Sequence, residues 1–161
     1  MEIFMKEDDL IVSKTDLKGN ITYGNETFIK MSGYDEAELL SSPHNILRHQ
    51  DMPKIVFKLL WNRIQNKQAI NAYVINKTKQ DNYYWVFSNV TASVDENNNI
   101  IGYHSARRKP SKNGVETIKE LYKELLHLEK TKGIDDAQKY LYSILDNEGV
   151  SYDEFIINLQ K

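Results

Sequence analysis

Hydrophobic and polar residues alternate in two short stretches near the start of the chain. Residues 10–16 and 21–23 are rich in β-branched side chains, and a turn-forming segment with Gly19 and Asn20 separates them. Two such stretches around a short turn predict a β-hairpin, in which Gly19 supplies the positive φ angle. The chain is therefore expected to begin with two antiparallel strands.

The spacing of apolar residues becomes helical after Asn25. Apolar side chains recur over residues 28–31 and again at 39–40, with a Ser-Gly-Tyr-Asp interruption between them. Asn25 and Asp35 stand where helix N-caps belong, and Glu38 lies three residues after Asp35 in a capping-box arrangement. We expect two short helices here.

A longer amphipathic pattern covers residues 55–64. Asp51 is a suitable N-cap for this helix, and Pro53 is suitable in its first turn because proline needs no amide partner there. The pattern predicts one long helix that ends near Asn66.

Alternation with a period of two then returns in three stretches, residues 70–75, 83–90 and 100–107. The turns between them, residues 79–82 and 95–99, are rich in Asn, Asp and Gln. Short turns of this composition join antiparallel neighbours, so the three strands are expected to lie side by side as a meander. The whole order predicts an α+β fold, an antiparallel five-stranded sheet with short helices across one face and a pocket between the two layers.

The last third of the chain has the spacing of three further amphipathic helices. A basic, turn-rich segment at residues 107–114 is expected to be a solvated boundary. The first helical pattern then runs from Val115 to Gly133, the second follows it and ends at Gly149, and the third begins with a capping box at Ser151. We predict one domain at residues 8–110 and a helical extension at 111–161. The apolar stripes of the extension need partners, which are the sheet, one another or another chain.

Composition narrows the classes of function. The 161 residues carry a formal net charge of -2, and there is no cysteine. A nucleic-acid or anionic-membrane surface is not expected from this charge, and thiolate catalysis and disulfides are excluded. The N-terminus is too acidic for a signal peptide, and no apolar run could cross a bilayer, so we expect a cytoplasmic protein. No catalytic motif is present, and we expect no enzymatic activity.

The segment from Pro43 to Pro53 concentrates polar chemistry. It holds two of the four histidines, His44 and His49, together with Arg48 and Asp51. Three interpretations remain open for these side chains. They cap helices or are solvated, they bind a transition metal, or Arg48 binds a phosphate or carbonyl while the histidines donate from the same side.

Several of these segments together resemble the PAS domain of bacterial aerotaxis receptors. The resemblance covers about residues 8–110 and rests on the segments 15–25, 32–34, 43–53, 84–86 and 102–107, of which the block PHNILRHQDMP at 43–53 is the most specific. It implies the PAS fold and a redox or energy-state sensor that holds FAD non-covalently. It also implies signalling to a separate, membrane-bound methyl-accepting chemotaxis transducer. Independently of the resemblance, the apolar stripe of the helix at residues 115–130 suggests a homodimer.

The resemblance also implies which residues meet the flavin. The family's flavin-associated positions fall on Asn25, His44, Arg48, His49, Asp51, Phe57 and Asn76, and Trp61 is added as a wall residue. We expect Arg48 and His49 to face the interior. Many family members have a tryptophan and a glycine where this chain has Ile70 and Ala72, so one aromatic stacking partner is absent. The alternatives are a haem sensor with His44, His49 or His104 as axial ligand, and an adaptor without cofactor.

Overall fold

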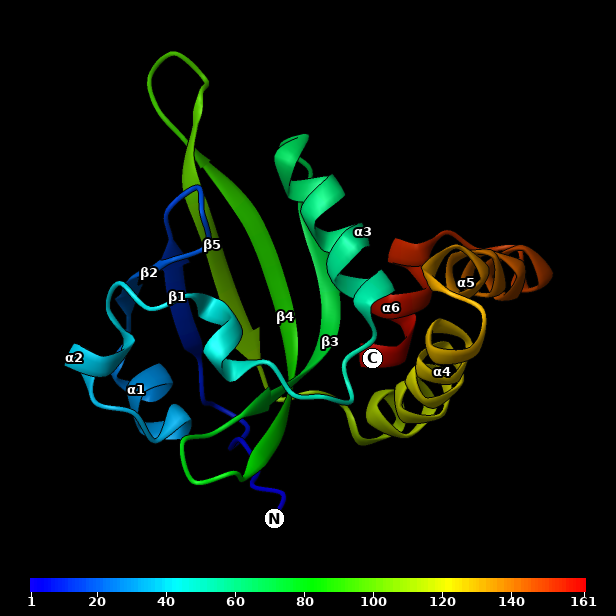
Figure 1. The fold of residues 1–161 in the computed structure, drawn as a ribbon, viewed down its shortest axis with the longest axis horizontal. Helices are drawn as coiled ribbons and strands as arrows, with labels where there is room; N and C mark the ends of the chain where they lie inside the picture. The colour runs from blue at the N-terminus through cyan, green and yellow to red at the C-terminus, as the bar shows by residue number, and fades with distance from the viewer.

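The computed structural model describes residues 1–161 and contains one five-stranded antiparallel sheet with six α-helices (Figure 1). The strand order is β2-β1-β5-β4-β3, so the predicted α+β fold and the predicted meander of the last three strands are confirmed. In chain order the elements are β1 (Ile11–Thr15), β2 (Ile21–Gly24), α1 (Glu26–Ser32), α2 (Glu36–Leu39), the 3-10 helix η1 (His44–Leu47), α3 (Lys54–Gln65), β3 (Ile70–Lys77), β4 (Tyr83–Val94), β5 (Ile100–Arg108), α4 (Lys112–Thr131), α5 (Ile134–Glu148) and α6 (Tyr152–Gln160). None of the helices is both long enough and apolar enough to cross a membrane.

Local signals explain the two short helices after the hairpin. The Asn25 side chain accepts a hydrogen bond from the amide of Phe28, which caps α1, and Gly33 ends the helix with a φ of 75°. Asp35 and Glu38 form the expected capping box of α2. These caps satisfy amides that have no partner within the helix.

The long helix α3 begins later than the sequence predicts, and Asp51 is not its cap. Pro53 occupies the N-cap position and has no side-chain acceptor. The carboxylate of Glu129 in α4 takes that role instead, since it accepts from the amides of Lys54 at 3.0 Å and Ile55 at 2.8 Å. A residue 75 positions away therefore caps the helix.

The segment at residues 107–114 is also more ordered than predicted. β5 continues to Arg108, and α4 begins at Lys112, with Ser111 as its N-cap. Gly114 lies in the first turn of α4 against the hydroxyl of Tyr73, where a Cβ atom would collide with that hydroxyl. Close packing against the sheet, and not solvation, governs this boundary.

The three C-terminal helices pack against the sheet and α3. Figure 1 shows α4, α5 and α6 gathered beside α3 and the edge strand β3, with α1 and α2 at the other edge of the sheet, near β1 and β2. The largest hydrophobic cluster crosses the predicted division of the chain at residue 110; among its buried members are Ile55, Val56, Tyr73, Ile75, Trp85, Ile118, Tyr122, Leu125, Leu141, Leu145, Phe155 and Ile156. The apolar stripes of the extension are thus covered mainly within this chain.

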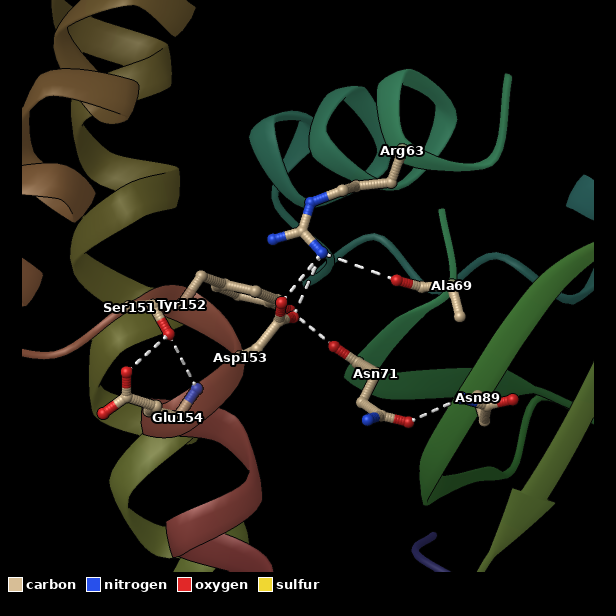
Figure 2. Close-up of polar contacts among 8 residues, drawn as sticks. All are labelled: Arg63, Ala69, Asn71, Asn89, Ser151, Tyr152, Asp153 and Glu154. Atoms are coloured by element: carbon tan, nitrogen blue, oxygen red, sulfur yellow. Dashed lines mark hydrogen bonds and ion pairs between the residues drawn. The ribbon is translucent and has the colours of Figure 1, made fainter. Parts of the chain in front are cut away.

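The extension also covers the edge strand β3. An edge strand presents unpaired backbone groups to solvent. Here the hydroxyl of Tyr152 donates to the carbonyl of Asn71 at 2.8 Å (Figure 2), and the hydroxyl of Tyr122 donates to the carbonyl of Tyr73 at 2.5 Å. The amide of Ile75 donates to the sulfur of Met52 at 3.3 Å.

An ion pair fixes α6 against the end of α3. One terminal nitrogen of Arg63 donates to both carboxylate oxygens of Asp153, at 3.0 and 3.1 Å, beside the ring of Tyr152 (Figure 2). Ser151 caps α6 by accepting from the amide of Glu154. α3 is therefore held by the extension at both ends, through Glu129 at its start and Asp153 at its end.

The hydrogen bond at the strand edge generates a first prediction. Tyr152→Phe should lower the free energy of unfolding by about 1 kcal/mol, because the carbonyl of Asn71 loses a donor in a part-buried place. Tyr142→Phe is the matched control, since Tyr142 is largely exposed and its hydroxyl has no partner. Chemical denaturation of both variants measures the difference, and equal stabilities would contradict the role given to Tyr152.

Candidate functional site

A cavity of about 270 Å³ lies between α3, η1 and the inner face of the sheet. The sheet face contributes alternate residues of its strands, and α3 contributes an apolar and aromatic wall. The principal lining residues are Ser13, Thr15, His44, Arg48, Phe57, Leu60, Trp61, Ile64, Val74, Asn76, Ser88, Val90, Tyr103, Ser105 and Arg107. Apolar walls with a few convergent polar groups are typical of a small-molecule site.

The register of the sheet brings the polar residues of the cavity together. Ser13 in β1 pairs with Ser105 in β5, and the hydroxyls of Ser105 and Ser88 lie 3.1 Å apart across β5 and β4. Because side chains alternate along a strand, Tyr103, Ser105 and Arg107 share the inner face. His104, between them, also lines the cavity. The strand β5 therefore supplies four cavity residues.

Arg107 is the central charged group of this site. It is only 2% exposed, yet no carboxylate pairs with it. One terminal nitrogen donates to the hydroxyl of Ser13, the guanidinium lies 5.0 Å from the ring centre of Phe28, and the Nε atom has no partner. Burial lowers the pKa of Arg107 to about 10, so the group remains charged at neutral pH. A buried cation without a counter-ion is costly and indicates a site for an electron-rich ligand.

His44 is held by the same network. Its Nε2 atom lies 3.1 Å from the hydroxyl of Ser13, and its ring stacks on Phe28. The Ser13 oxygen accepts from Arg107, and with a neutral imidazole its own proton can be donated to Nε2 of His44. Burial, and then the charge of Arg107, lower the pKa of His44 to about 3.

Asn76 adds a second donor without a partner. It is 4% exposed, lines the cavity from β3, and its Nδ2 atom has no hydrogen-bond acceptor. The hydroxyl of Tyr84 lies opposite Asn76 across the strand pair and also makes no hydrogen bond of good geometry; burial raises the pKa of Tyr84, while the charge of Arg107 and then the side chain of Asn76 oppose the rise. Unpartnered buried donors are rare in proteins and mark a place where a ligand acceptor belongs.

Three more of the predicted residues lie at this cavity. Arg48 stands at its edge with its guanidinium 4.1 Å from the ring centre of Phe57, and Trp61 meets Tyr103 edge to face at 5.2 Å. Trp61 is 37% exposed, so it covers the opening and leaves one side in solvent. Arg48 is likewise exposed, which places it at the mouth and not in the interior.

Asn25, His49 and Asp51 do not line this cavity. The carboxamide of Asn25 is used locally, since it accepts from the amides of Val12 and Phe28 and donates to the carbonyl of Leu10. His49 packs against Tyr83 outside the cavity, and its Nδ1 atom accepts from the amide of Asp51. The expectation that His49 faces the interior therefore does not hold.

The sequence prediction missed Arg107 and Ser13. The signal was present, because Arg107 stands two residues after Ser105 and four after Tyr103 and therefore shares their face of a strand. It was assigned to a basic boundary instead. No group of three or more His, Asp or Glu side chains is arranged to hold a metal ion. Two of the three histidines considered as haem ligands, His44 and His104, line the cavity, and His49 does not.

The donor set fits a flavin. The pyrimidine edge of a flavin ring presents carbonyl and ring-nitrogen acceptors, and Arg107 and Asn76 offer buried donors to such an edge. Phe57, Trp61 and Tyr103 supply flat aromatic contacts from the walls. Ile70, where many family members have a tryptophan, packs in a cluster with Ile64, Val90 and the aromatic Tyr103.

The burial of His44 generates a prediction of pH dependence. The pKa of His44 is about 3 in the folded protein and about 6.5 in the unfolded chain, so the unfolded chain binds the extra proton first as the pH falls. The free energy of unfolding should therefore fall by about 1 to 2 kcal/mol between pH 7 and pH 5 on account of His44. Denaturation of His44→Gln at the two pH values should show a smaller fall, whereas His127→Gln, an exposed control, should keep the wild-type fall.

Comparisons with known proteins agree with this geometry. A family model described as the PAS fold matches residues 21–107. The aerotaxis receptor of Escherichia coli (strain K12) is 36% identical over 121 residues, which are 75% of this chain and 24% of the receptor. This chain therefore spans about a quarter of the length of that relative.

Solved structures give the same fold. A light-oxygen-voltage domain studied with a flavin analogue superposes with a TM-score of 0.62 at 15% identity, over 71% of this chain and 87% of that one. The PAS domain of a protein from Colwellia psychrerythraea superposes with a TM-score of 0.58 at 19% identity, over 64% of this chain and 87% of that one. With the family match over residues 21–107 and the identity to the receptor, the chain belongs to the PAS fold family, and its PAS domain is of the aerotaxis-receptor type.

Proposed function

We propose that this chain is a redox sensor that binds FAD in the cavity and signals to a separate chemotaxis transducer in the membrane. The observation that carries the proposal is the buried guanidinium of Arg107, which has no anionic partner and lies in one cavity with the free amide of Asn76. The kinship with an aerotaxis receptor supports the same conclusion. We further propose that the protein acts in the cytoplasm, is not an enzyme, and works singly or as a homodimer.

The residues of the cavity have distinct roles in this proposal. Bound flavin supplies reversible uptake of one or two electrons with their protons. Arg107 and Asn76 hold the acceptor edge of the ring, and Ser13 fixes the orientation of Arg107. Neutral His44 adds no second positive charge beside Arg107. Trp61 and Phe57 shield the site from solvent.

Two physical links connect the cavity to the extension. Arg107 stands next to the end of β5, and the backbone beyond it is bound to α6, because Gln160 donates to the carbonyl of Lys109 and accepts from the amide of Ser111. The wall helix α3 is capped by Glu129. A change of charge beside Arg107 alters the interaction energy by a few kcal/mol. That is enough to shift an equilibrium between two conformations of similar free energy, and the extension is the part of the chain that contacts both links.

The cofactor assignment is tested by absorption. Purified wild-type protein should show a flavin band at about 450 nm. Arg107→Met should lose flavin affinity by at least about tenfold, because a charge-assisted hydrogen bond to the ring is removed. Its stability should not fall, because a methionine needs no counter-ion when buried. Arg108→Met is the matched control, since Arg108 is the next residue and is exposed.

Two results would contradict the assignment. Full flavin content in Arg107→Met would remove Arg107 from the site. A colourless wild-type preparation from cells with ample flavin would show that the protein binds no flavin. A Soret band would show that it binds haem instead.

The signalling part predicts a redox-dependent interaction. The affinity of the full chain for the cytoplasmic part of the transducer should differ between oxidised and reduced buffer. Glu129→Gln should reduce that difference, because a neutral amide is a weaker partner for the amides that open α3. Glu124→Gln, on an exposed position of the same helix, should leave it unchanged. Equal binding in both buffers by the wild type would defeat the proposal.

A further inference from the structure

A second hollow lies on the other side of Arg48. It is an open cleft of about 910 Å³ between the segment that leads into α3 and the junction of α4 with α5. The PAS part contributes Arg48, Lys54 and Lys77, and the extension contributes Leu126, Glu129 and Lys130. The cleft therefore exists only because the extension packs where it does.

The cleft is strongly basic in a chain whose formal net charge is -2. Arg48, Lys54, Lys77 and Lys130 all line it, and none of them has an ion-pair partner. The only acid in its wall is Glu129, whose two oxygens accept from the first amides of α3. Asp51 lies nearby, 3.8 Å from the imidazole of His49. The cations are left free for an anion.

The cleft and the cavity are adjacent. Asn45 and Arg48 line both of them. The cavity, at about 270 Å³, is slightly smaller than the ~300 Å³ at which pockets for drug-sized ligands begin, so a whole dinucleotide exceeds it. The remainder of such a ligand has to leave past Arg48.

We propose that this basic cleft binds the diphosphate of an adenine nucleotide. Arg48 and the three lysines hold the phosphate oxygens, and the apolar side chains of Leu126 and Ile134 lie where they can contact the base. In the first form of the proposal, which rests on the proposed function, the nucleotide is the adenosine half of FAD. In the second, free ADP binds by the same chemistry.

The experiment compares flavins that share the ring and differ in the phosphates. FAD and riboflavin are titrated into full-length, flavin-depleted protein, and ADP is titrated alone by calorimetry. The cleft variant carries Lys54→Gln and Lys130→Gln. The control variant carries Lys119→Gln and Lys123→Gln, which remove the same charge from exposed positions of α4 outside the cleft.

The cleft variant should lose affinity only for the flavin that carries phosphates. The cleft variant should bind FAD about tenfold more weakly and riboflavin unchanged, because each lost charge contact contributes about a factor of three. The control should match the wild type for both ligands. Salt should weaken the binding of FAD more than that of riboflavin. ADP binding that the cleft variant loses would show that the free nucleotide is also a ligand.

The diphosphate site in the cleft and the flavin site in the cavity can be contradicted independently. If riboflavin and FAD bind the wild type equally well, and the cleft variant has the wild-type affinity for both, the cleft is not a diphosphate site. The flavin assignment then stands. If neither flavin binds, the flavin assignment falls, and ADP alone then decides the cleft: binding that depends on Lys54 and Lys130 supports it, and no binding overturns it.

Discussion

The packing of α4, α5 and α6 against β3, β4 and α3 is the constraint on which the rest of the molecule depends. It buries Tyr73, Ile75 and Trp85 on the outer face of the sheet, and in the same cluster it buries Ile55 and Val56 of the wall helix. Apolar burial of this extent is the dominant stabilising term in a domain of this size. The cavity, the cleft and the position of α3 all follow from it, because each is bounded by an element that this cluster holds.

The wall helix has the same dependence in its polar contacts. A helix start needs acceptors for its first amides, and α3 finds them in Glu129 of another helix instead of in its own flanking sequence. At its other end, Arg63 is paired with Asp153 of α6. A displacement of the extension would therefore leave amides without partners at one end of α3 and a guanidinium without its partner at the other. The division of the chain at residue 110 remains a prediction, but the two parts are not mechanically independent.

The limits of sequence reasoning follow from the range of the interactions. The sheet order and the caps of α1 and α2 depend on neighbours a few residues apart, such as the Asp35–Glu38 box and the turns rich in Asn and Asp, so they could be predicted. The cap of α3 and the pairing of Ser13 with Arg107 join residues 75 and 94 positions apart, and no local pattern indicates them. Asn25 is the helix cap that its position predicted, and the site role that the resemblance implied does not hold for the cavity, because its carboxamide makes three hydrogen bonds locally. Arg107 was hidden among consecutive cations, although alternation along β5 would have placed it inward.

The closed edge of β3 restricts how this protein can assemble. A sheet grows from one molecule to the next only where an outer strand offers free amides and carbonyls in a row. Tyr152 and Tyr122 occupy that row on β3, and on β2 the backbone of Ile21 is already bonded to Ser41 and Ser42. Association through a shared, continuous sheet is thereby hindered at both edges. Contacts with a second copy or with a transducer must use the faces of the sheet or the surfaces of the helices. A partly unfolded chain in which α6 has detached would expose backbone groups of β3 and could aggregate through that edge.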